Sequence, residues 1–223
     1  GEKGGDDLKA AIFDLDGTLI DSLWIWEQAD TEVLRRHGYV PDDAYYASVS
    51  HLNYGQCLDY ILSRYPLPMT KEALSAEIYQ LAFRHYNEIR SLKPGAKAYL
   101  EALHKRGIKL GMATACLRSI CEQVLKNCDV FGLFDVIVYS DEIGCNKSNP
   151  DIYLRTAALL QTQPSAVVSF EDVPQAVRSA KKAGMVTVGV ADSFWKEKVG
   201  VLEQEADYFI LDFCEKSIAQ IPI

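Results

Sequence analysis

Apolar residues along this chain follow two patterns, which divide it into a helical stretch and an alternating one. Between residues 21 and 91 they recur at helical spacing, so that Leu58, Ile61 and Leu62, for example, share one face. From residue 93 onwards, short apolar runs alternate with helical segments. The pattern therefore predicts an all-helical block followed by an α/β repeat.

The α/β repeat predicts a parallel sheet with helices on both of its faces. Strands are expected over residues 108–113, 135–140, 166–170, 186–190 and 208–210, and helices over 94–106, 117–127, 150–161, 174–183 and 196–204. Strands separated by helices of this length form right-handed crossover units on one parallel sheet. The predicted fold class is therefore α/β, with a Rossmann-like sheet.

One more apolar run, residues 10–13, precedes the helical block and stops abruptly at Asp14. We assign this run to the same sheet, because it is typical of a buried strand. The helical block then becomes an insertion. The predicted domains are an α/β core of residues 8–20 and 93–223, a helical cap of residues 21–92, and a flexible tail of residues 1–7, with hinges at 19–22 and 91–95.

Two expectations concern the start of the helical block. Asp21 or Ser22 is expected to cap a helix that continues through Leu34.

Four aromatic residues of the helical block could line a sugar-sized pocket. Aromatic side chains on short helices are more often part of a core, and this is the interpretation that we favour. They are Trp24, Trp26, Tyr45 and Tyr46.

Composition and charge narrow the class of protein. The chain has 223 residues, 48% of them hydrophobic, and a formal net charge of -8, which disfavours general binding to nucleic acid or to an anionic membrane. No stretch approaches the roughly 20 apolar residues that cross a bilayer, and the polar N-terminus lacks the apolar centre of a signal peptide. The 6 cysteines of the chain form no Cys-x-x-Cys pair, so we expect reduced thiols and a cytoplasmic location. A monomer or weak homo-oligomer is also expected.

Polar residues that could carry chemistry follow the predicted strands. Taken singly, each is more often a helix cap or a solvated side chain. Because the carboxyl ends of parallel strands meet at one edge of a sheet, where open α/β sheets bind ligands, we expect these residues to form one site. They are Asp14 and Asp16 after the first strand, Thr114 after the second, Lys147 after the third, and Glu171 and Asp172 after the fourth.

The chemistry of this set indicates a metal and a phosphoryl group. Four carboxylates at one edge would repel one another unless a cation intervened, and oxygen ligands without His or Cys favour Mg²⁺. Of Asp14 and Asp16, one could act as nucleophile or metal ligand and the other as acid or base, since Gly17 can turn the second back toward the first. Lys147 adds positive charge and Thr114 a hydroxyl, a combination that fits phosphoryl transfer.

These residues resemble the four signature motifs of the haloacid dehalogenase superfamily of phosphotransferases. The motifs are Asp14-Leu15-Asp16-Gly17-Thr18, Thr114, Lys147 and Glu171-Asp172, in the right order on a βα repeat. The segments Asp21-Ser22, Asn149-Pro150-Asp151 and Ala183-Gly184-Met185 are similar to those of the subgroup with a helical cap after the first motif. The resemblance covers nearly the whole chain, and similar members include phosphoglycolate phosphatase, sugar phosphatases and β-phosphoglucomutase.

The resemblance implies a role for each motif residue. Asp14 would attack phosphorus to form an aspartyl-phosphate, and Asp16 would protonate the leaving oxygen and later deprotonate the hydrolytic water. Thr114 would bind the phosphoryl group, and Lys147 would neutralise it and orient Asp14. Mg²⁺ would be held by the carboxylates of Asp14 and of Glu171-Asp172 and by the backbone carbonyl of Asp16. The presence of Asp16 separates this chain from the dehalogenases proper and implies a phosphatase.

Substrate contacts are expected beside the phosphoryl site and in the cap. The candidates are Thr114, Ala115, Arg118, His51 and Asn53. The resemblance implies that the cap segment with His51 and Asn53 meets the substrate. In β-phosphoglucomutase that segment carries an arginine for a second phosphate, and this chain has Asn53 at about that place. This change weakens a mutase interpretation, although Arg84, Arg90 or Arg118 could substitute from elsewhere.

The chain departs from the motifs of similar members at two places. Lys147 is followed by Ser148, where proline is usual, which could loosen the loop that aims the lysine. After Asp172, Val173-Pro174 stands where a small polar residue is common, and a proline suits the first turn of a helix.

Three function hypotheses follow. The leading one is a Mg²⁺-dependent phosphatase that hydrolyses a small phosphomonoester, such as a sugar phosphate, through an aspartyl-phosphate on Asp14. The alternative is an isomerase like β-phosphoglucomutase, in which the phosphoryl group returns to the substrate. The third is a non-catalytic binding protein on the same fold. Because a binding protein needs no second aspartate, Asp16 speaks against the third.

Overall fold

The computed structural model describes residues 7–49, 52 and 54–223 and forms two compact units. The α/β unit consists of the residues through Ser22 together with Ile89–Ile223, and the helical unit of Leu23–Glu88. The predicted domain boundaries, after residue 20 and before residue 93, lie close to these limits. His51, Asn53 and all but the last residue of the predicted N-terminal tail lie outside the described residues.

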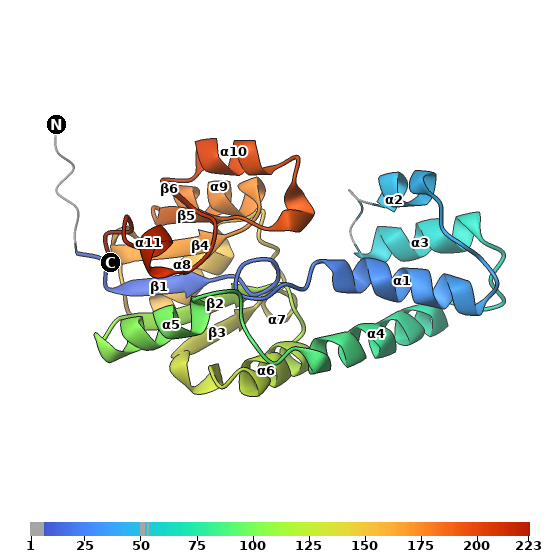
Figure 1. Cartoon of the computed structure of the whole chain (residues 1–223), viewed down its shortest axis with the longest axis horizontal. Helices are drawn as coiled ribbons and strands as arrows, with labels where there is room; N and C mark the ends of the chain where they lie inside the picture. The colour runs from blue at the N-terminus through green and yellow to red at the C-terminus, as the bar shows by residue number, and fades with distance from the viewer. Residues whose placement is uncertain (1–6, 50–51, 53) are drawn as a thin grey trace. The chain divides into compact units, whose positions relative to one another are not determined.

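The described part of the α/β unit contains six parallel strands in the order β3-β2-β1-β4-β5-β6 (Figure 1). They are β1 (Ala10–Phe13), β2 (Lys109–Thr114), β3 (Val136–Tyr139), β4 (Val167–Glu171), β5 (Val186–Val190) and β6 (Tyr208–Ile210). The predicted α/β class is confirmed. The chain proceeds from β1 to β2 and β3 on one side and returns to β4 on the other. The strand order therefore reverses between β1 and β4, the place where such sheets bind ligands.

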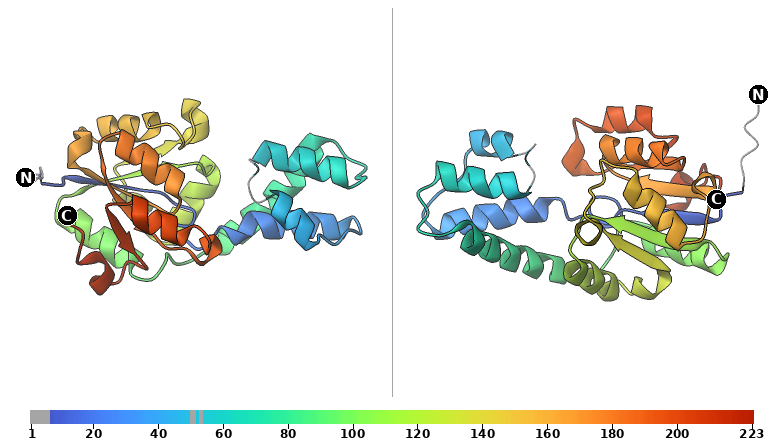
Figure 2. Two further views of the ribbon diagram at one scale, coloured as in Figure 1. Left: turned by 90° about the horizontal axis from the view of Figure 1, so that it is seen from above. Right: turned by 180° about the vertical axis from the view of Figure 1, so that it is seen from behind.

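Helices cover both faces of this sheet (Figure 2). The longer ones are α5 (Ala96–Lys105), α6 (Arg118–Asn127), α8 (Asp151–Leu159), α9 (Pro174–Lys182) and α10 (Val199–Glu205). Pro174 opens α9, as its sequence context predicted. The short elements are not predicted by the sequence, because one helical turn carries too little periodicity to be recognised. They are α7 (Ser140–Ile143), α11 (Glu215–Ile218) and the 3₁₀ turns η1 (Phe131–Leu133), η2 (Pro164–Ala166) and η3 (Ser193–Trp195).

Strand β1 is buried on both faces, which explains its unbroken apolar run. Ala10 and Ile12 belong to a core cluster that includes residues of α8 and α9. On the opposite face, Phe13 stacks on Phe170 with the ring centroids 4.4 Å apart and meets Tyr99 of α5 edge-on. The packing of both faces fixes β1 at the centre of the sheet and thereby fixes the residues that follow it.

The helical unit contains α1 (Trp24–Arg36), α2 (Asp43–Val49), α3 (Tyr54–Arg64) and α4 (Lys71–Glu88). The predicted cap of α1 is wrong. The residue at the cap position is Leu23, which makes no side-chain cap hydrogen bond, whereas the Ser22 hydroxyl donates to Asp16 at 2.6 Å. Thr70 does cap α4, because its hydroxyl accepts the backbone N–H of Ala73 at 3.1 Å.

The four aromatic residues singled out in the helical unit differ in burial. Tyr45 is fully buried, and Trp26 and Tyr46 are half-buried. Trp24 is 40% exposed, and its ring meets that of His85 edge-on with the ring centroids 5.4 Å apart. The expectation of core packing is thus wrong for Trp24, because the buried face of α1 contains Ile25 and the residues one turn apart from it.

Asp30, inside the helical unit, gives that unit a pH-dependent stability. Its buried carboxylate accepts hydrogen bonds from the hydroxyl of Tyr45 at 3.4 Å and the thiol of Cys57 at 3.5 Å. Burial raises the pKa of Asp30 to about 7 from a usual value of 3.8. Because the folded pKa lies above the unfolded one, the stabilisation is complete below the unfolded pKa and is lost as the pH rises through the folded pKa.

We therefore expect the free energy of unfolding to fall by about 2–3 kcal/mol between pH 5 and pH 8.5 through Asp30 alone. Asp30→Asn should remove this decrease, whereas Asp43→Asn, at an exposed position of the same unit, should retain it. Urea unfolding followed by circular dichroism at the two pH values measures the difference. Equal pH dependence in the wild type and in Asp30→Asn would contradict the assignment.

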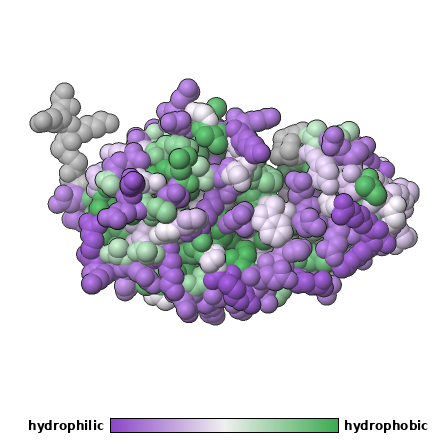
Figure 3. Space-filling view, in the orientation of Figure 1, coloured by the Kyte–Doolittle hydropathy of each residue, from purple (hydrophilic) through white to green (hydrophobic). Residues whose placement is uncertain are grey.

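The surface of the chain is mostly hydrophilic. Hydrophilic residues cover most of the face in Figure 3, with hydrophobic residues in small groups between them. Within the described ranges, no helix is both long and apolar enough to cross a membrane. The six cysteines are free thiols in the structure.

Candidate active site

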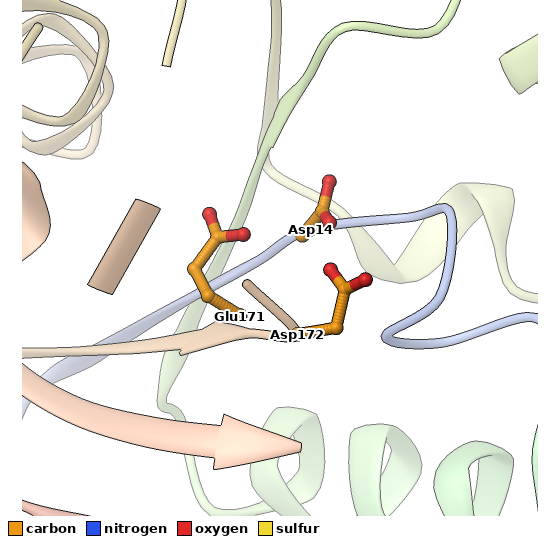
Figure 4. Close-up of side chains that lie close together, drawn as sticks. All are labelled: Asp14, Glu171 and Asp172. Atoms are coloured by element: carbon orange, nitrogen blue, oxygen red, sulfur yellow. The ribbon is translucent and has the colours of Figure 1, made fainter. Parts of the chain in front are cut away.

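The pairing of β1 with β4 brings three carboxylates together at the reversal point of the sheet. Phe13 is in register with Phe170, so Asp14 emerges beside Glu171 and Asp172. The backbone N–H of Asp14 continues the ladder by donating to the Phe170 carbonyl at 3.1 Å. The three side chains are buried, converge in Figure 4, and offer one oxygen each, all within 4.8 Å of one another.

Lys147 joins two of these carboxylates. Its Nζ lies 2.9 Å from Oδ1 of Asp14 and 2.6 Å from Oε1 of Glu171. The Tyr153 hydroxyl, at the start of α8, donates to the same Glu171 oxygen at 2.6 Å. Lys147 and Tyr153 thus hold Glu171 from the side of the third strand, and Lys147 links it to Asp14.

The loop that carries Lys147 is held without the usual proline. The side chain of Asn146 accepts the backbone N–H of Ser148 at 3.0 Å and also the Ser148 hydroxyl. The side chain of Asn149 accepts the backbone N–H of Asp151 at 2.9 Å, at the start of α8. These two turns, in which an asparagine side chain binds the backbone two residues on, order the loop in place of proline.

Burial dominates the electrostatics of the cluster. It raises the pKa of Glu171 to about 8, although Lys147 opposes the shift. Burial, followed by the charge of Asp14, raises the pKa of Asp172 well above its ordinary value. For Lys147, burial would lower the pKa, but the charges of Asp14 and Glu171 outweigh it and raise the pKa. One lysine therefore does not compensate the acidic charge of the cluster.

The residues present fit a small divalent cation. Among the described residues, Oε2 of Glu171 is buried and has no hydrogen-bond partner, which is costly unless a further group binds it. Three convergent carboxylates and no His or Cys form a donor set for a hard ion. The structure therefore supports a metal site at Asp14, Glu171 and Asp172, in agreement with the sequence analysis.

Asp172 is held by two further hydrogen bonds. The Thr18 hydroxyl lies 3.2 Å from Oδ1 of Asp172 and 3.3 Å from Oδ2 of Asp14, so it bridges the two carboxylates. The indole N–H of Trp195, in η3, donates to Oδ2 of Asp172 at 2.7 Å. The loops after β1 and β5 thus both orient this carboxylate.

The turn after Asp14 places Asp16 beside, rather than inside, the metal group. The Leu15 carbonyl accepts the backbone N–H groups of residues 18–20, and Gly17 takes a positive φ of 77°, which glycine adopts most readily. The half-buried side chain of Asp16 accepts the Ser22 hydroxyl. Its carboxylate is not part of the cluster, and the resemblance assigns only its backbone carbonyl to the metal.

Hydrogen bonds from Lys93 link this turn to the segment where the chain returns to the α/β unit. Its Nζ donates to the Gly17 carbonyl at 2.5 Å and to the Ala191 carbonyl at 3.2 Å, and it lies 2.6 Å from Oδ2 of Asp192. Its backbone N–H also donates to the Leu19 carbonyl at 2.8 Å. The two predicted hinges are therefore hydrogen-bonded to each other.

The residues after β2 fall into two groups. Thr114 is fully buried and its hydroxyl oxygen accepts the backbone N–H of Cys116 at 3.0 Å, which leaves the hydroxyl proton to donate to a ligand. Ala115 is exposed. Arg118 is exposed and makes a bidentate ion pair with Glu142, with both N–O distances 2.7 Å. Its Nη1 also donates to Glu122 at 3.0 Å, so binding of substrate by Arg118 would compete with these ion pairs.

Comparisons with known proteins identify the family. A family model described as haloacid dehalogenase-like hydrolase matches residues 11–190, which include the described site from Asp14 to Asp172. The chain belongs to this family. The resemblance and the hydrolase class inferred from the sequence are thereby confirmed.

Named relatives of this hydrolase act on phosphorylated compounds. This chain is 29% identical over 208 residues to validoxylamine A 7'-phosphate phosphatase of Streptomyces hygroscopicus subsp. limoneus. The matched residues cover 93% of this chain and 95% of the relative. It is 27% identical over 187 residues to a phosphorylated carbohydrates phosphatase of Thermotoga maritima, with 83% and 87% covered. A solved structure from Thermotoga maritima, provisionally described as a β-phosphoglucomutase, superposes with a TM-score of 0.80 at 26% identity over 91% of this chain and 94% of that one.

Sequence reasoning missed several residues that position the site of this hydrolase. Tyr153, Trp195 and Lys93 lie outside the four motifs. The fold brings Tyr153 and Trp195 to the carboxylates and Lys93 to the turn that follows Asp14. Tyr153 could have been suspected from the sequence. A buried glutamate at the end of a strand requires hydrogen-bond donors, and the helix before β4 contains this tyrosine. No pattern in the sequence indicates Trp195 or Lys93.

Proposed function

We propose that this hydrolase is a Mg²⁺-dependent phosphatase that transfers the phosphoryl group of a phosphorylated sugar or related small metabolite first to Asp14 and then to water. The observation that carries the proposal is the Asp14 carboxylate, buried at the reversal point of the sheet with one oxygen 2.9 Å from Lys147. The named relatives that act on phosphorylated carbohydrates support the substrate class.

In the first step, a carboxylate oxygen of Asp14 bonds to phosphorus while the bond from phosphorus to the leaving oxygen breaks. Lys147, which already touches Oδ1 of Asp14, orients the nucleophile and lies where it can offset charge on the phosphoryl group. Thr114 has a hydroxyl proton to donate to a phosphoryl oxygen. Asp16 gives its proton to the leaving oxygen, so that the product departs as a neutral alcohol.

In the second step, water attacks phosphorus and the bond to Asp14 breaks. Asp16, now ionised, accepts the proton of the water, and Ser22 holds its carboxylate by the 2.6 Å hydrogen bond. Mg²⁺, when bound by Asp14, Glu171, Asp172 and the Asp16 carbonyl, supplies positive charge that offsets the phosphoryl oxygens and the carboxylates.

An isomerase of the phosphoglucomutase type is the second candidate, supported by the structural similarity to the Thermotoga maritima protein. The two reactions share the attack by Asp14 and differ in whether water or a sugar hydroxyl receives the phosphoryl group. The chain's cytoplasmic location and its state as a monomer or weak homo-oligomer stay predictions.

A panel of phosphorylated metabolites, assayed for phosphate release with Mg²⁺ and with excess chelator, tests the proposal. We expect release from one or more sugar phosphates, and loss of at least about 100-fold of the rate when Mg²⁺ is removed. Conversion of β-glucose 1-phosphate to the 6-phosphate without net phosphate release would favour the isomerase. A chelator-resistant phosphatase would contradict the metal assignment.

A further inference from the structure

Trp195 donates a short hydrogen bond to the buried carboxylate of Asp172. At 2.7 Å, the indole N–H approaches Oδ2 of Asp172 more closely than Thr18 approaches Oδ1. A carboxylate that is nearly fully buried requires donors, and the loop after β5 supplies this one. The bond joins η3, in the loop after β5, to a residue of the metal group that follows β4.

The segment that carries Trp195 is itself firmly placed. Asp192 begins η3 by accepting the backbone N–H of Phe194 at 2.9 Å through its Oδ1. Its Oδ2 is 2.6 Å from Nζ of Lys93; the side chain of Asp192 is buried and that of Lys93 is only 10% exposed. Since Lys93 also binds the Gly17 carbonyl, one cation links η3 to the turn that follows Asp14.

Two neighbouring side chains also contact the indole ring. Phe194 meets it edge-on with the ring centroids 4.9 Å apart. The ammonium of Lys198 lies 4.2 Å from the ring centroid, within the range of a cation–π contact. These contacts determine the direction of the N–H group, so that the hydrogen bond to Asp172 has a defined geometry.

We propose that Trp195 is a positioning residue for the metal group, acting through Asp172. The N–H holds one oxygen of the Asp172 carboxylate and so fixes the rotation of the carboxylate, which orients it for a cation before the cation arrives. The proposal rests on the Mg²⁺ site of the proposed function. Removal of a partner that orients a metal ligand typically lowers metal affinity by about 10–100-fold.

The variant Trp195→Phe tests this role, because it keeps an aromatic ring and removes the N–H. Trp24→Phe is the matched control, since Trp24 belongs to the helical unit and is partly exposed. The Mg²⁺ concentration that gives a half-maximal rise in the thermal unfolding midpoint is measured for both variants and the wild type. We expect it to be at least about 10-fold higher in Trp195→Phe and unchanged in Trp24→Phe.

The outcomes separate the inference from the proposed function. Equal Mg²⁺ dependence in all three proteins would overturn the role of Trp195 and leave the metal site standing. No response to Mg²⁺ in any of them would overturn the metal site, and with it the inference.

A second measurement does not depend on the variant's stability. The wild-type protein is labelled with 5-fluorotryptophan, and the fluorine resonance of Trp195 should shift on addition of Mg²⁺. This resonance is assigned as the one missing from labelled Trp195→Phe, or by replacing Trp24 and Trp26 in turn. A shift confined to Trp195 supports the contact with the metal group. A Trp195 resonance that stays constant while Mg²⁺ stabilises the protein would overturn it.

Discussion

Asp14→Asn is expected to lower the rate of phosphate release by roughly 10⁴-fold or more while the protein stays folded, since loss of a nucleophile removes the central step of covalent catalysis. The amide has nearly the shape of the carboxylate but neither its charge nor its nucleophilicity. It also removes a charged partner of Lys147 and one oxygen of the metal group. Steady-state phosphate release measures the effect, and the thermal unfolding midpoint reports the fold.

The control for this variant is Asp129→Asn. The side chain of Asp129 is 88% exposed, and the positive backbone φ of 57° at this position suits asparagine. Its rate should equal that of the wild type. Undiminished turnover in Asp14→Asn, or an equal loss in both variants, would contradict the assignment of the nucleophile.

Lys147→Met should be the most destabilising substitution in the site. It keeps much of the length of the side chain and leaves the buried carboxylates of Asp14 and Glu171 without their shared cation. Removing one partner of a buried ion pair typically costs about 3–5 kcal/mol. We expect a loss of that order in urea unfolding without Mg²⁺, together with a severe loss of phosphate release.

Mg²⁺ should restore part of the stability of Lys147→Met, because a bound cation would compensate the same carboxylates. Lys126→Met, whose side chain is 55% exposed, is the matched control and should change stability by less than about 1 kcal/mol. A Lys147→Met protein as stable and active as Lys126→Met would be incompatible with the geometry described here.

The fold and the centre of the site could be predicted from the sequence because both depend on local patterns. The apolar run that ends at Asp14 marks β1, and Glu171-Asp172 ends β4. Parallel strands align their carboxyl ends, so knowledge of the strand ends suffices to bring these carboxylates to one edge. Lys147 was predicted in the same way, from its place after β3.

The remaining contacts could not be predicted, since they depend on tertiary packing. Ser22 has the residue type of a helix cap, yet its hydroxyl binds Asp16 because the turn after β1 brings the two together. Lys93 and Trp195 are distant in sequence from the residues that they bind. The sequence predicts a substrate role for Arg118 from its place after Thr114 and its charge, and the structure pairs its guanidinium with Glu142.

The central claim is that the phosphoryl group passes through Asp14. Acid quenching of the wild-type enzyme during turnover of a sugar phosphate, followed by peptide mass spectrometry, tests it most directly. We predict a phosphoryl group on Asp14 in the wild type and none on that peptide in Asp14→Asn. Continued turnover with the phosphoryl group on another residue, or on none, would contradict the account.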